Sequence, residues 1–430
     1  MKRAGILFLV LVHAQVFPQT WPSVASCTYN WTCFQLSPSG NELYIGGQSD
    51  LFNSQVVNYI CKWNGSSATA LYGGMSGGNL PSVDAMTFYN NQLVAGGRFI
   101  NAGSSVVNNI AVLNSSNWQG LGAGMNGTVS SLKVYNGELY AGGYFTIADT
   151  VNSPGIAKWN GTQWMRVGTG FTDLVSELET FNGELYVATN TAKIYKWDGI
   201  NWTYLMDFNC NTPFCSPAIY CMKNLYNSQL YVGGYFDLFN NSTVPANNIA
   251  RFDGNTWSAV GNASFMQYPT WDPVASMTEK NGMLYITGSF DSINNMFSNS
   301  FAMWNGVNWQ TINSGPYDGA CIEVFQGDIY VGARNNLRRL DSTLSVHEIF
   351  MDRIEANVFP VPAKERITFS VPCTDKIISI SITDVSGKKI YMPVELQNYT
   401  ADISLLQGGI YFFEAITEKQ ERFFGKLIKQ

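Results

Sequence analysis

Histidine is almost absent from this chain of 430 residues, which contains only two, His13 and His347. His13 lies in an N-terminal segment that we expect to be removed. A zinc or copper site built on imidazole needs two or three histidines, and a Ser-His-Asp or Cys-His arrangement would depend on His347 alone. His347 lies in strand-like sequence and is expected to be a surface or packing residue. The sequence therefore predicts no metal site, no cofactor and no enzymatic activity.

Charged residues are also scarce, at 13% of the chain with a net charge of −6. An acidic chain lacks the basic surface that nucleic acid or an anionic membrane requires. A membrane-spanning helix needs about 20 consecutive apolar residues, and no segment has them. Lys2 and Arg3 precede an apolar run over residues 4–12 and a plausible cleavage point after Ala14. This pattern predicts a signal peptide over residues 1–14 and a secreted or surface-attached protein with no membrane span.

The chain has eight cysteines but no CxxC spacing of the kind found in zinc or redox sites. In an exported protein, cysteines that lie near one another in sequence are candidates for local disulfides, and buried thiols are the alternative. The candidates for disulfides are Cys27, Cys33, Cys210, Cys215 and Cys221.

What the chain has in abundance is a repeated strand. A short apolar segment ending in small residues recurs seven times, at intervals of 45 to 54 residues. Asn-Gly or a similar pair precedes most copies, as at Asn136-Gly137, and this pair favours the type I′ turn of a two-residue hairpin. A second turn follows downstream, as in WNGTQW from Trp159. The copies are LYIGG from Leu43, LVAGG from Leu93, LYAGG from Leu139, LYVAT from Leu185, LYVGG from Leu230, LYITG from Leu284 and IYVGA from Ile329.

Two hairpins per repeat give four antiparallel strands, and one such sheet cannot bury both of its faces. Seven sheets packed radially can do so. We therefore predict an all-β fold, a seven-bladed β-propeller with four antiparallel strands per blade, over residues 20–351. The last repeat stops after Leu340, so we expect it to borrow a strand from the segment around residues 33–36. Aromatic pairs such as Trp159 and Trp164 recur at one fixed place and are expected to pack between blades.

These repeats resemble the kelch-like propeller repeat and, more closely, related bacterial repeats of the GGxFxxxN…NIAxWNG type. The matching segments are GGYFDLFNN from Gly233 and NNIARFDG from Asn247. The fourth repeat departs from the pattern, because Val187-Ala188-Thr189 replaces the glycine doublet.

After about residue 351 the sequence changes, since none of the twelve tryptophans lies beyond that point. Short alternating apolar segments predict a small β-sandwich over residues 352–430. This segment resembles the C-terminal sorting domain of the Bacteroidetes type IX secretion system, although Val361 replaces the usual asparagine of its first motif. The resemblance implies export through that secretion machinery, removal of the tail, and release or attachment at the cell surface. A fibronectin-like module that stays attached is the alternative. The matching motifs are FPVPA from Phe359, TDVSGKKI from Thr383, LLQGGIYFFEA from Leu405 and FFGKLIKQ from Phe423.

Function is expected on one face of the propeller. The tight turns lie at one end of each blade, so the long and variable connections emerge at the other end, where binding residues are usually placed. An aromatic side chain beside Asn or Asp suits a sugar or peptide contact. The candidate binding residues are Tyr268, Trp271, Asp272, Asp237 and Asp291.

We therefore predict an interaction protein that binds a glycan or a protein through the long-loop face. Two alternatives remain open. One is a polysaccharide-active hydrolase or lyase that uses loop carboxylates, and the other is a structural component of the cell surface. Fold alone does not separate them, because propellers carry many functions.

Overall fold

The computed structural model describes most of the propeller and much of the C-terminal segment. The chain divides into two compact units, residues 1–344 and 345–430. The described residues are 21–27, 33–210, 216–225, 228–239, 245–266, 274–312, 315–340, 357–360, 363–370, 376–384, 389–390, 394–395, 398–417 and 422–429.

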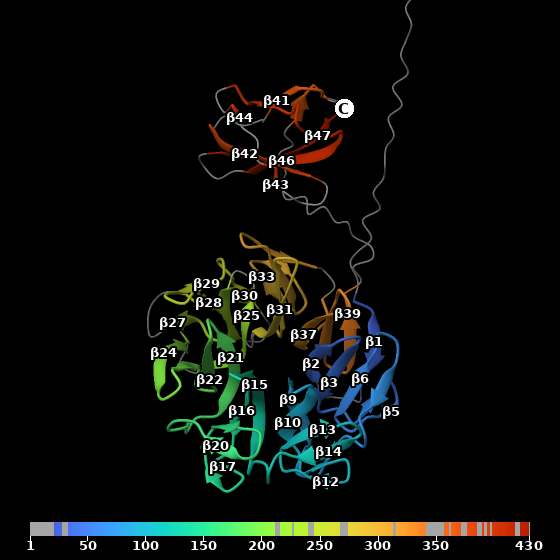
Figure 1. The fold of residues 1–430 in the computed structure, drawn as a ribbon, viewed down its shortest axis with the longest axis vertical. Coiled ribbons are helices and arrows are strands. Elements are labelled where there is room, and N and C mark those ends of the chain that lie inside the picture. The colour runs from blue at the N-terminus through green and yellow to red at the C-terminus, as the bar shows by residue number, and fades with distance from the viewer. Residues whose placement is uncertain are drawn as a thin grey trace, which may run out of the picture. The chain divides into compact units, whose positions relative to one another are not determined.

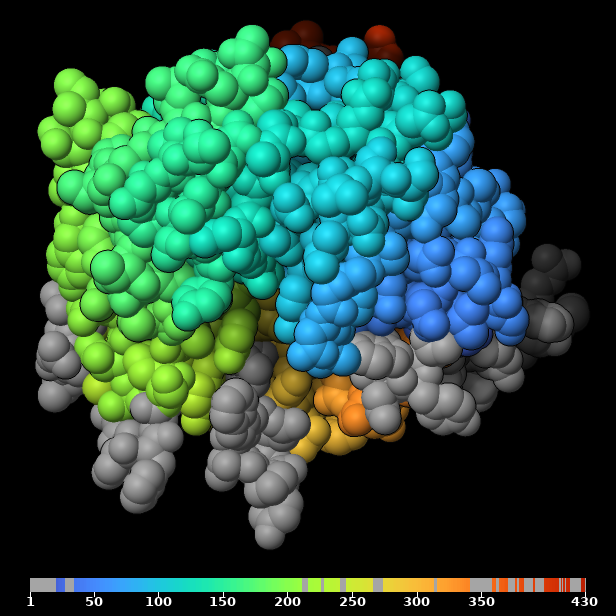
Figure 2. Space-filling model, turned by 90° about the horizontal axis from the view of Figure 1, so that it is seen from below, coloured from blue at the N-terminus to red at the C-terminus, as the bar shows by residue number. Residues whose placement is uncertain are grey.

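In the described part of the first unit, seven antiparallel sheets have four or five strands, and we number them as blades 1 to 7 along the chain (Figure 1). The first strand of each blade contacts the first strands of its two neighbours, and β2 of blade 1 contacts β37 of blade 7, so the ring is closed. Figure 2 shows one flank of this ring, on which blue, cyan and green segments follow one another in chain order. These inner strands are β2 (Cys33–Ser39), β9 (Ser82–Tyr89), β15 (Thr128–Tyr135), β21 (Val175–Phe181), β25 (Ala218–Leu225), β31 (Val274–Lys280) and β37 (Gly319–Phe325).

Three further strands complete each blade outward from the inner strand. The second strands carry the repeated small residues, and the fourth strands form the rim. The second strands are β3 (Glu42–Gly47), β10 (Gln92–Arg98), β16 (Glu138–Tyr144), β22 (Glu184–Thr189), β26 (Gln229–Tyr235), β32 (Met283–Gly288) and β38 (Asp328–Ala333). The third strands are β6 (Ile60–Trp63), β13 (Ile110–Asn114), β19 (Ile156–Trp159), β23 (Lys193–Trp197), β28 (Ile249–Phe252), β35 (Phe301–Trp304) and β39 (Asn336–Arg339). The fourth strands of blades 1 to 6 are β7 (Ala68–Ala70), β14 (Asn117–Gly120), β20 (Trp164–Arg166), β24 (Trp202–Asn209), β29 (Trp257–Ala259) and β36 (Trp309–Thr311).

The fourth strand of blade 7 comes from the N-terminal segment. It is β1 (Ser23–Ser26), which pairs with β39. The prediction that residues 33–36 would fill this place is wrong, because they belong to β2, the inner strand of blade 1. The turn at Gly40, with φ of +57°, joins β2 to β3 as a hairpin and so places β2 at the start of its own blade.

The two turn series differ in length. Asn136 and Gly137 join β15 to β16 with φ of 49° and 78°, as a two-residue type I′ turn requires. The second series forms longer loops, because Trp159 pairs with Trp164 across four intervening residues. In that loop the Asn160 side-chain oxygen accepts hydrogen bonds from the backbone N–H groups of Thr162 and Gln163, each at 3.0 Å. The prediction of a second tight hairpin is therefore corrected to an Asx-stabilised loop.

The first residue of the small pair in the second strand faces the next blade. A Cβ atom on Gly96 would lie 2.5 Å from Cγ1 of Val129, so only glycine leaves room for that valine. Between blades 6 and 7 the arrangement is reversed. Blade 6 has Thr287 in place of the glycine, and blade 7 has Gly319 at the inner-strand position where blades 2, 3, 4 and 6 have valine. The larger side chain thus belongs to the second strand of blade 6 here, whereas in the Gly–Val pairs it belongs to the inner strand of the following blade. The same Gly–Val pairing occurs for Gly46 with Val83, Gly142 with Val175 and Gly233 with Val274.

Tryptophans join neighbouring blades at the rim. The indole Nε1 of Trp164 donates a 2.7 Å hydrogen bond to the Leu121 carbonyl of the preceding blade, and Trp309 donates a 3.0 Å bond to Val260. Trp118 makes the equivalent bond to Leu71 at 2.9 Å. These contacts place the repeated aromatic residues in blade-to-blade packing.

The connections between second and third strands also join blades. In blade 2, β11 (Asn101–Ala102) and β12 (Ser105–Val106) form a small hairpin, and β11 also pairs with β8 (Met75–Ser76), which follows blade 1. In blade 6, β33 (Ser292–Ile293) pairs in the same way with β30 (Phe265–Met266), which follows blade 5. Much of the long-loop face is therefore structural.

The second unit consists of two four-stranded sheets. One contains β40 (Asn357–Phe359), β41 (Arg366–Ser370), β45 (Thr400–Asp402) and β44 (Val394–Glu395). The other contains β43 (Lys389–Ile390), β42 (Ile377–Asp384), β46 (Gly409–Thr417) and β47 (Arg422–Lys429). Side chains of both sheets, including Phe369 and Phe413, share one buried cluster, as in a β-sandwich.

Candidate functional site

A β-bulge recurs at one position of every inner strand. In β15, Val129 pairs with Gly143 and Ser131 with Gly142, so Ser130 is the extra residue. In this blade a Cβ on Gly143 would overlap the Thr128 carbonyl oxygen, whereas blades 4 and 7 form the same bulge opposite Thr189 and Ala333. A bulge redirects a side chain that regular alternation would place elsewhere. The extra residues of the seven blades are Phe34, Asp84, Ser130, Ser176, Tyr220, Ala275 and Ala320.

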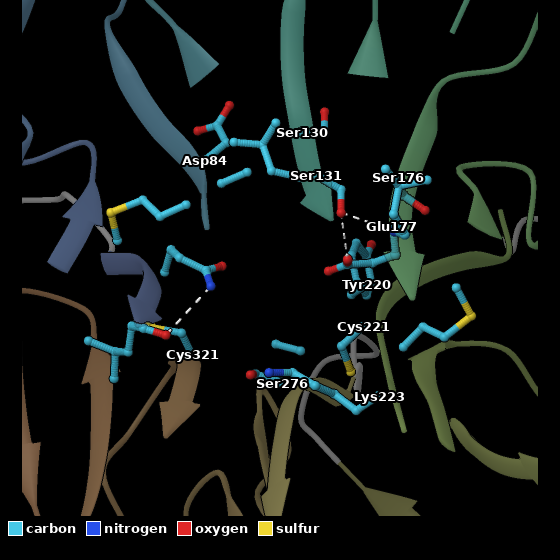
Figure 3. Close-up of a pocket in the computed structure, with 18 of the residues that line it drawn as sticks. Asp84, Ser130, Ser131, Ser176, Glu177, Tyr220, Cys221, Lys223, Ser276 and Cys321 are labelled. Carbon is cyan, nitrogen blue, oxygen red and sulfur yellow. Dashed lines mark hydrogen bonds between the residues drawn. The ribbon is translucent and has the colours of Figure 1, made fainter. Parts of the chain in front are cut away.

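The inner strands surround a cavity of about 570 Å³ at the centre of the ring (Figure 3). Its size falls in the range of about 300–1,000 Å³ that small-ligand sites occupy. Four bulge residues with functional side chains line it: Asp84, Ser130, Ser176 and Tyr220. Arg98, at the end of β10, also lines it and lies where the long connections begin. The cavity therefore reaches the long-loop end of the ring.

Charged side chains three residues after the extra residue form ion pairs between inner strands. Lys133 of blade 3 forms an ion pair with Glu179 of blade 4, whose side chain is only 8% exposed. Lys223 of blade 5 pairs with Glu323 of blade 7 at 3.5 Å, and Thr278 of blade 6 donates a 3.0 Å hydrogen bond to the same carboxylate. Burial alone would lower the pKa of Lys223. The negative charges of Glu323, Glu179 and Glu177 together outweigh burial and raise the pKa above its ordinary value, so the lysine stays charged.

Glu177 differs from these paired groups. Its Oε2 accepts a 3.0 Å hydrogen bond from Ser131 Oγ, while the same Oγ accepts one from the backbone N–H of Leu178, also at 3.0 Å. Burial raises the pKa of Glu177 to about 7, against the lowering effects of Lys223, the Ser131 hydrogen bond and Lys133. The carboxyl therefore exchanges a proton near neutral pH.

Asp84 is a second carboxyl in the cavity wall with a raised pKa. Burial is the main cause, and the nearby Ser82 hydroxyl and the positive charge of Arg98 oppose it. Tyr220, by contrast, is 41% exposed although it lines the cavity. The cavity thus combines titratable carboxyls, hydroxyls and one accessible aromatic ring.

Of the candidate binding residues predicted from sequence, the two that the structure describes, Asp237 and Asp291, do not line this cavity. Asp237 and Asp291 lie in the connections after β26 and β32, and their backbone carbonyls each accept two N–H bonds from residues further along the loop. The carbonyl of Ile100 accepts the same pair of bonds in blade 2, so this position serves the loop whatever its side chain. Tyr268, Trp271 and Asp272 lie outside the described residues, as does His347.

The cysteine predictions have mixed outcomes. Cys210 is disulfide-bonded, and its predicted neighbour Cys215 lies outside the described residues. Cys221 is corrected: it is a buried free thiol whose pKa is raised, first by burial and then by Glu177. Cys27 is a half-buried thiol rather than the disulfide partner of Cys33, whose backbone begins β2. The repeat explains the Cys221 result, because its inner-strand position faces the close-packed neighbouring blade, near Val274.

Among the described residues, no group of three or more His, Cys, Asp or Glu side chains is placed to hold a metal ion. Within the same part of the chain, none of the segments forms a helix with the length and apolarity needed to cross a membrane.

The sequence predicts binding residues in the long connections, whereas the cavity residues lie in the inner strands. A signal was present in the sequence: aligned on the small pair, the inner strands of blades 2 to 5 place Asp84, Ser130, Ser176 and Tyr220 at one repeat position. A repeat position that is polar in four successive copies indicates a shared polar space.

One family model matches the chain, over residues 357–430, and it describes a secretion system C-terminal sorting domain. This finding agrees with the sandwich described above and identifies the second unit as a type IX sorting domain. The chain is therefore marked for secretion or attachment at the cell surface through that machinery. No curated protein sequence matches the chain.

Solved structures of similar fold share little sequence with it. A chain of the mitotic checkpoint complex is 14% identical, with a TM-score of 0.50, and the alignment covers 79% of this chain and 99% of that chain. The WD40 β-propeller domain of Doa1 is 12% identical with a TM-score of 0.48, covering 75% and 96% respectively. Virginiamycin B lyase from Staphylococcus aureus is 12% identical with a TM-score of 0.47, covering 74% and 98%. At such identities the likeness concerns the fold alone.

Proposed function

We propose that this exported protein is a recognition module that binds a glycan in the central cavity, through the long-loop end of the propeller, and that it is not an enzyme. We also infer that its repeats are of the kelch-like glycine-doublet type and that residues 1–14 are a signal peptide. In this proposal the type IX secretion machinery recognises the sorting domain, and the propeller binds the glycan.

The observation that carries the proposal is Tyr220. Its ring is 41% exposed but borders a cavity whose other bulge residues, Ser130 and Ser176, present hydroxyl groups. A sugar offers an apolar ring face to an aromatic side chain and hydroxyls to polar neighbours. A protein partner remains the alternative ligand.

The test is a glycan array probed with the full chain and with two variants. Tyr220→Ala should reduce binding about tenfold or more, because it removes the large apolar contact surface. Tyr204→Ala is the matched control, since Tyr204 is a similarly exposed tyrosine on the outer strand β24. Equal binding by all three proteins would contradict the proposal.

A second candidate is a polysaccharide-active hydrolase or lyase. It is supported by Glu177, because a carboxyl with a pKa of about 7 is suited to general acid–base catalysis near neutral pH. The alternative predicts release of reducing ends or unsaturated products from a polysaccharide, abolished in Glu177→Gln. Binding without turnover favours the recognition module.

A further inference from the structure

Glu177 stands apart in the charge balance of the cavity. Each cationic side chain of the wall is close to an acidic one: Lys133 to Glu179, Lys223 to Glu323, and Arg98 to Asp84. Within the described residues, Glu177 forms no ion pair. It is the one carboxyl of the described wall that is left over when these pairs are formed.

Its hydrogen bonding is also incomplete. Ser131 has a single hydroxyl proton, and because its oxygen accepts from Leu178 N–H, that proton is directed to Glu177 Oε2. In the described part of the chain, no donor reaches the second carboxylate oxygen. Glu177 is half-buried at the cavity wall and shares its two neighbouring lysines with Glu179 and Glu323, so a positively charged donor placed beside it would stabilise the ionised carboxylate.

We propose that Glu177 forms a subsite for a primary ammonium group, so that the cavity recognises an amino sugar with a free amine. The inference rests on the proposed function, since it assumes that a glycan enters the cavity. An ammonium group supplies three donors and a positive charge, whereas an N-acetylated amine supplies one donor and no charge. The hydroxyls of Ser130 and Tyr220 remain for the sugar ring, and Ser176 Oγ, which donates a 3.3 Å hydrogen bond to the Ala188 carbonyl, can still accept one.

Other charged groups near Glu177 do not remove the need for a cation. Lys223 and Lys133 lower its pKa and Glu179 raises it, but burial outweighs all three. Both lysines are already engaged by other carboxylates. The titratable and charged groups that interact with Glu177 are Lys133, Glu179, Cys221 and Lys223. The others that line the same cavity are Asp84, Arg98, Tyr220, Cys321 and Glu323.

Binding of an ammonium group is coupled to proton release. Below pH 7 Glu177 is mostly protonated, and an ammonium group favours the ionised form. Binding at pH 6 therefore expels a proton from the carboxyl, and the affinity falls as the pH falls below 7.

The experiment is isothermal titration of the full chain with a glucosamine tetramer and with its fully N-acetylated counterpart. At pH 7, Glu177→Gln should weaken binding of the free-amine tetramer about tenfold or more, the loss expected for a hydrogen bond to a charged group. The N-acetylated tetramer should bind wild type and variant alike. Glu184→Gln is the matched control, because Glu184 lies in the same blade, pairs with Lys196 at 3.1 Å and does not line the cavity.

A second readout separates an ionic contact from a general disturbance of the fold. Titrations at pH 6 in two buffers with different ionisation enthalpies should show proton release on binding by wild type and none by Glu177→Gln. Equal loss for both tetramers, or no loss, would overturn the ammonium subsite.

The two proposals fail differently. Suppose that both tetramers bind the wild type, that both bind Tyr220→Ala more weakly, and that neither loses affinity for Glu177→Gln. The glycan site in the cavity is then supported and the ammonium subsite is wrong. If neither tetramer and no glycan on the array binds wild type, both proposals are wrong.

Discussion

The packing between blades 6 and 7 predicts that two damaging substitutions will compensate each other. A Cβ atom on Gly319 would overlap Thr287 Oγ1 and lie 3.1 Å from Val331 Cγ1, so Gly319→Val cannot be accommodated without movement. Thr287 Oγ1 also donates a 2.7 Å hydrogen bond to the Ser300 carbonyl, which holds its side chain in place. The valine would therefore push against a fixed side chain.

The magnitudes follow from these contacts. Overpacking costs about 1–3 kcal/mol, and displacing Thr287 from Ser300 adds about 1 kcal/mol. Thr287→Gly alone costs a similar amount, since it removes the hydrogen bond, leaves a void and adds backbone freedom of about 0.5–1 kcal/mol. The double variant recreates the Gly–Val pairing found between four other pairs of neighbouring blades. We expect a favourable coupling energy of about 1–3 kcal/mol.

The assay is equilibrium urea unfolding followed by tryptophan fluorescence. All twelve tryptophans precede residue 310, so the emission reports on the propeller alone. A thermodynamic cycle over the wild type, two single variants and the double variant gives the coupling energy. The reciprocal cycle between blades 3 and 4, with Gly142→Thr and Val175→Gly, should show coupling of the same sign. Free energies that add within about 0.5 kcal/mol in both cycles would refute the packing argument.

Three further predictions concern other parts of the molecule. Trp164→Phe should lower the free energy of unfolding, measured by thermal unfolding, by about 1–3 kcal/mol, because it leaves the Leu121 carbonyl without its hydrogen-bond donor. Trp304→Phe should lower it less, since Nε1 of Trp304 has no hydrogen-bond partner among the described atoms. Glu177 has a pKa of about 7 when folded, against 4.5 for a glutamate in an unfolded chain, so the folded state binds more protons between these values and loses stability as the pH rises through this window. Glu177→Gln should therefore raise the urea midpoint at pH 8 and change it little at pH 4.5; a midpoint shift that is the same at both pH values would contradict this. Mass spectrometry of the exported protein should find no peptides from residues 357–430 if the sorting domain is removed, and stoichiometric recovery of that segment would show that it is retained.

Much of the propeller could be predicted because each repeat carries its own local signals. The Asn136-Gly137 turn fixes a hairpin, and the continuous run of apolar and small residues in LYAGG indicates a strand that is buried on both faces. The closing strand β1 escaped prediction because Ser23–Ser26 has no turn signal and pairs with a partner more than 300 residues away. Non-local pairing of this kind leaves no trace in a short segment.

The candidate site could not be predicted from strand periodicity. A bulge adds one residue to a strand, so Ser130 and Tyr220 point where regular alternation would not place them. The raised pKa of Glu177 likewise depends on enclosure by several blades, and no stretch of sequence contains that information. Asp237 and Asp291 were predicted to bind a ligand because they are carboxylates in long loops. The structure places them at a repeated loop position, and they do not line the cavity.

The most direct test of the central claim is a crystal structure of the full chain with the best ligand from the glycan array. The account predicts density for a sugar inside the central cavity, against Tyr220 and within hydrogen-bonding distance of Ser130 or Ser176. Density confined to the rim of the blades, with an empty cavity, would contradict it.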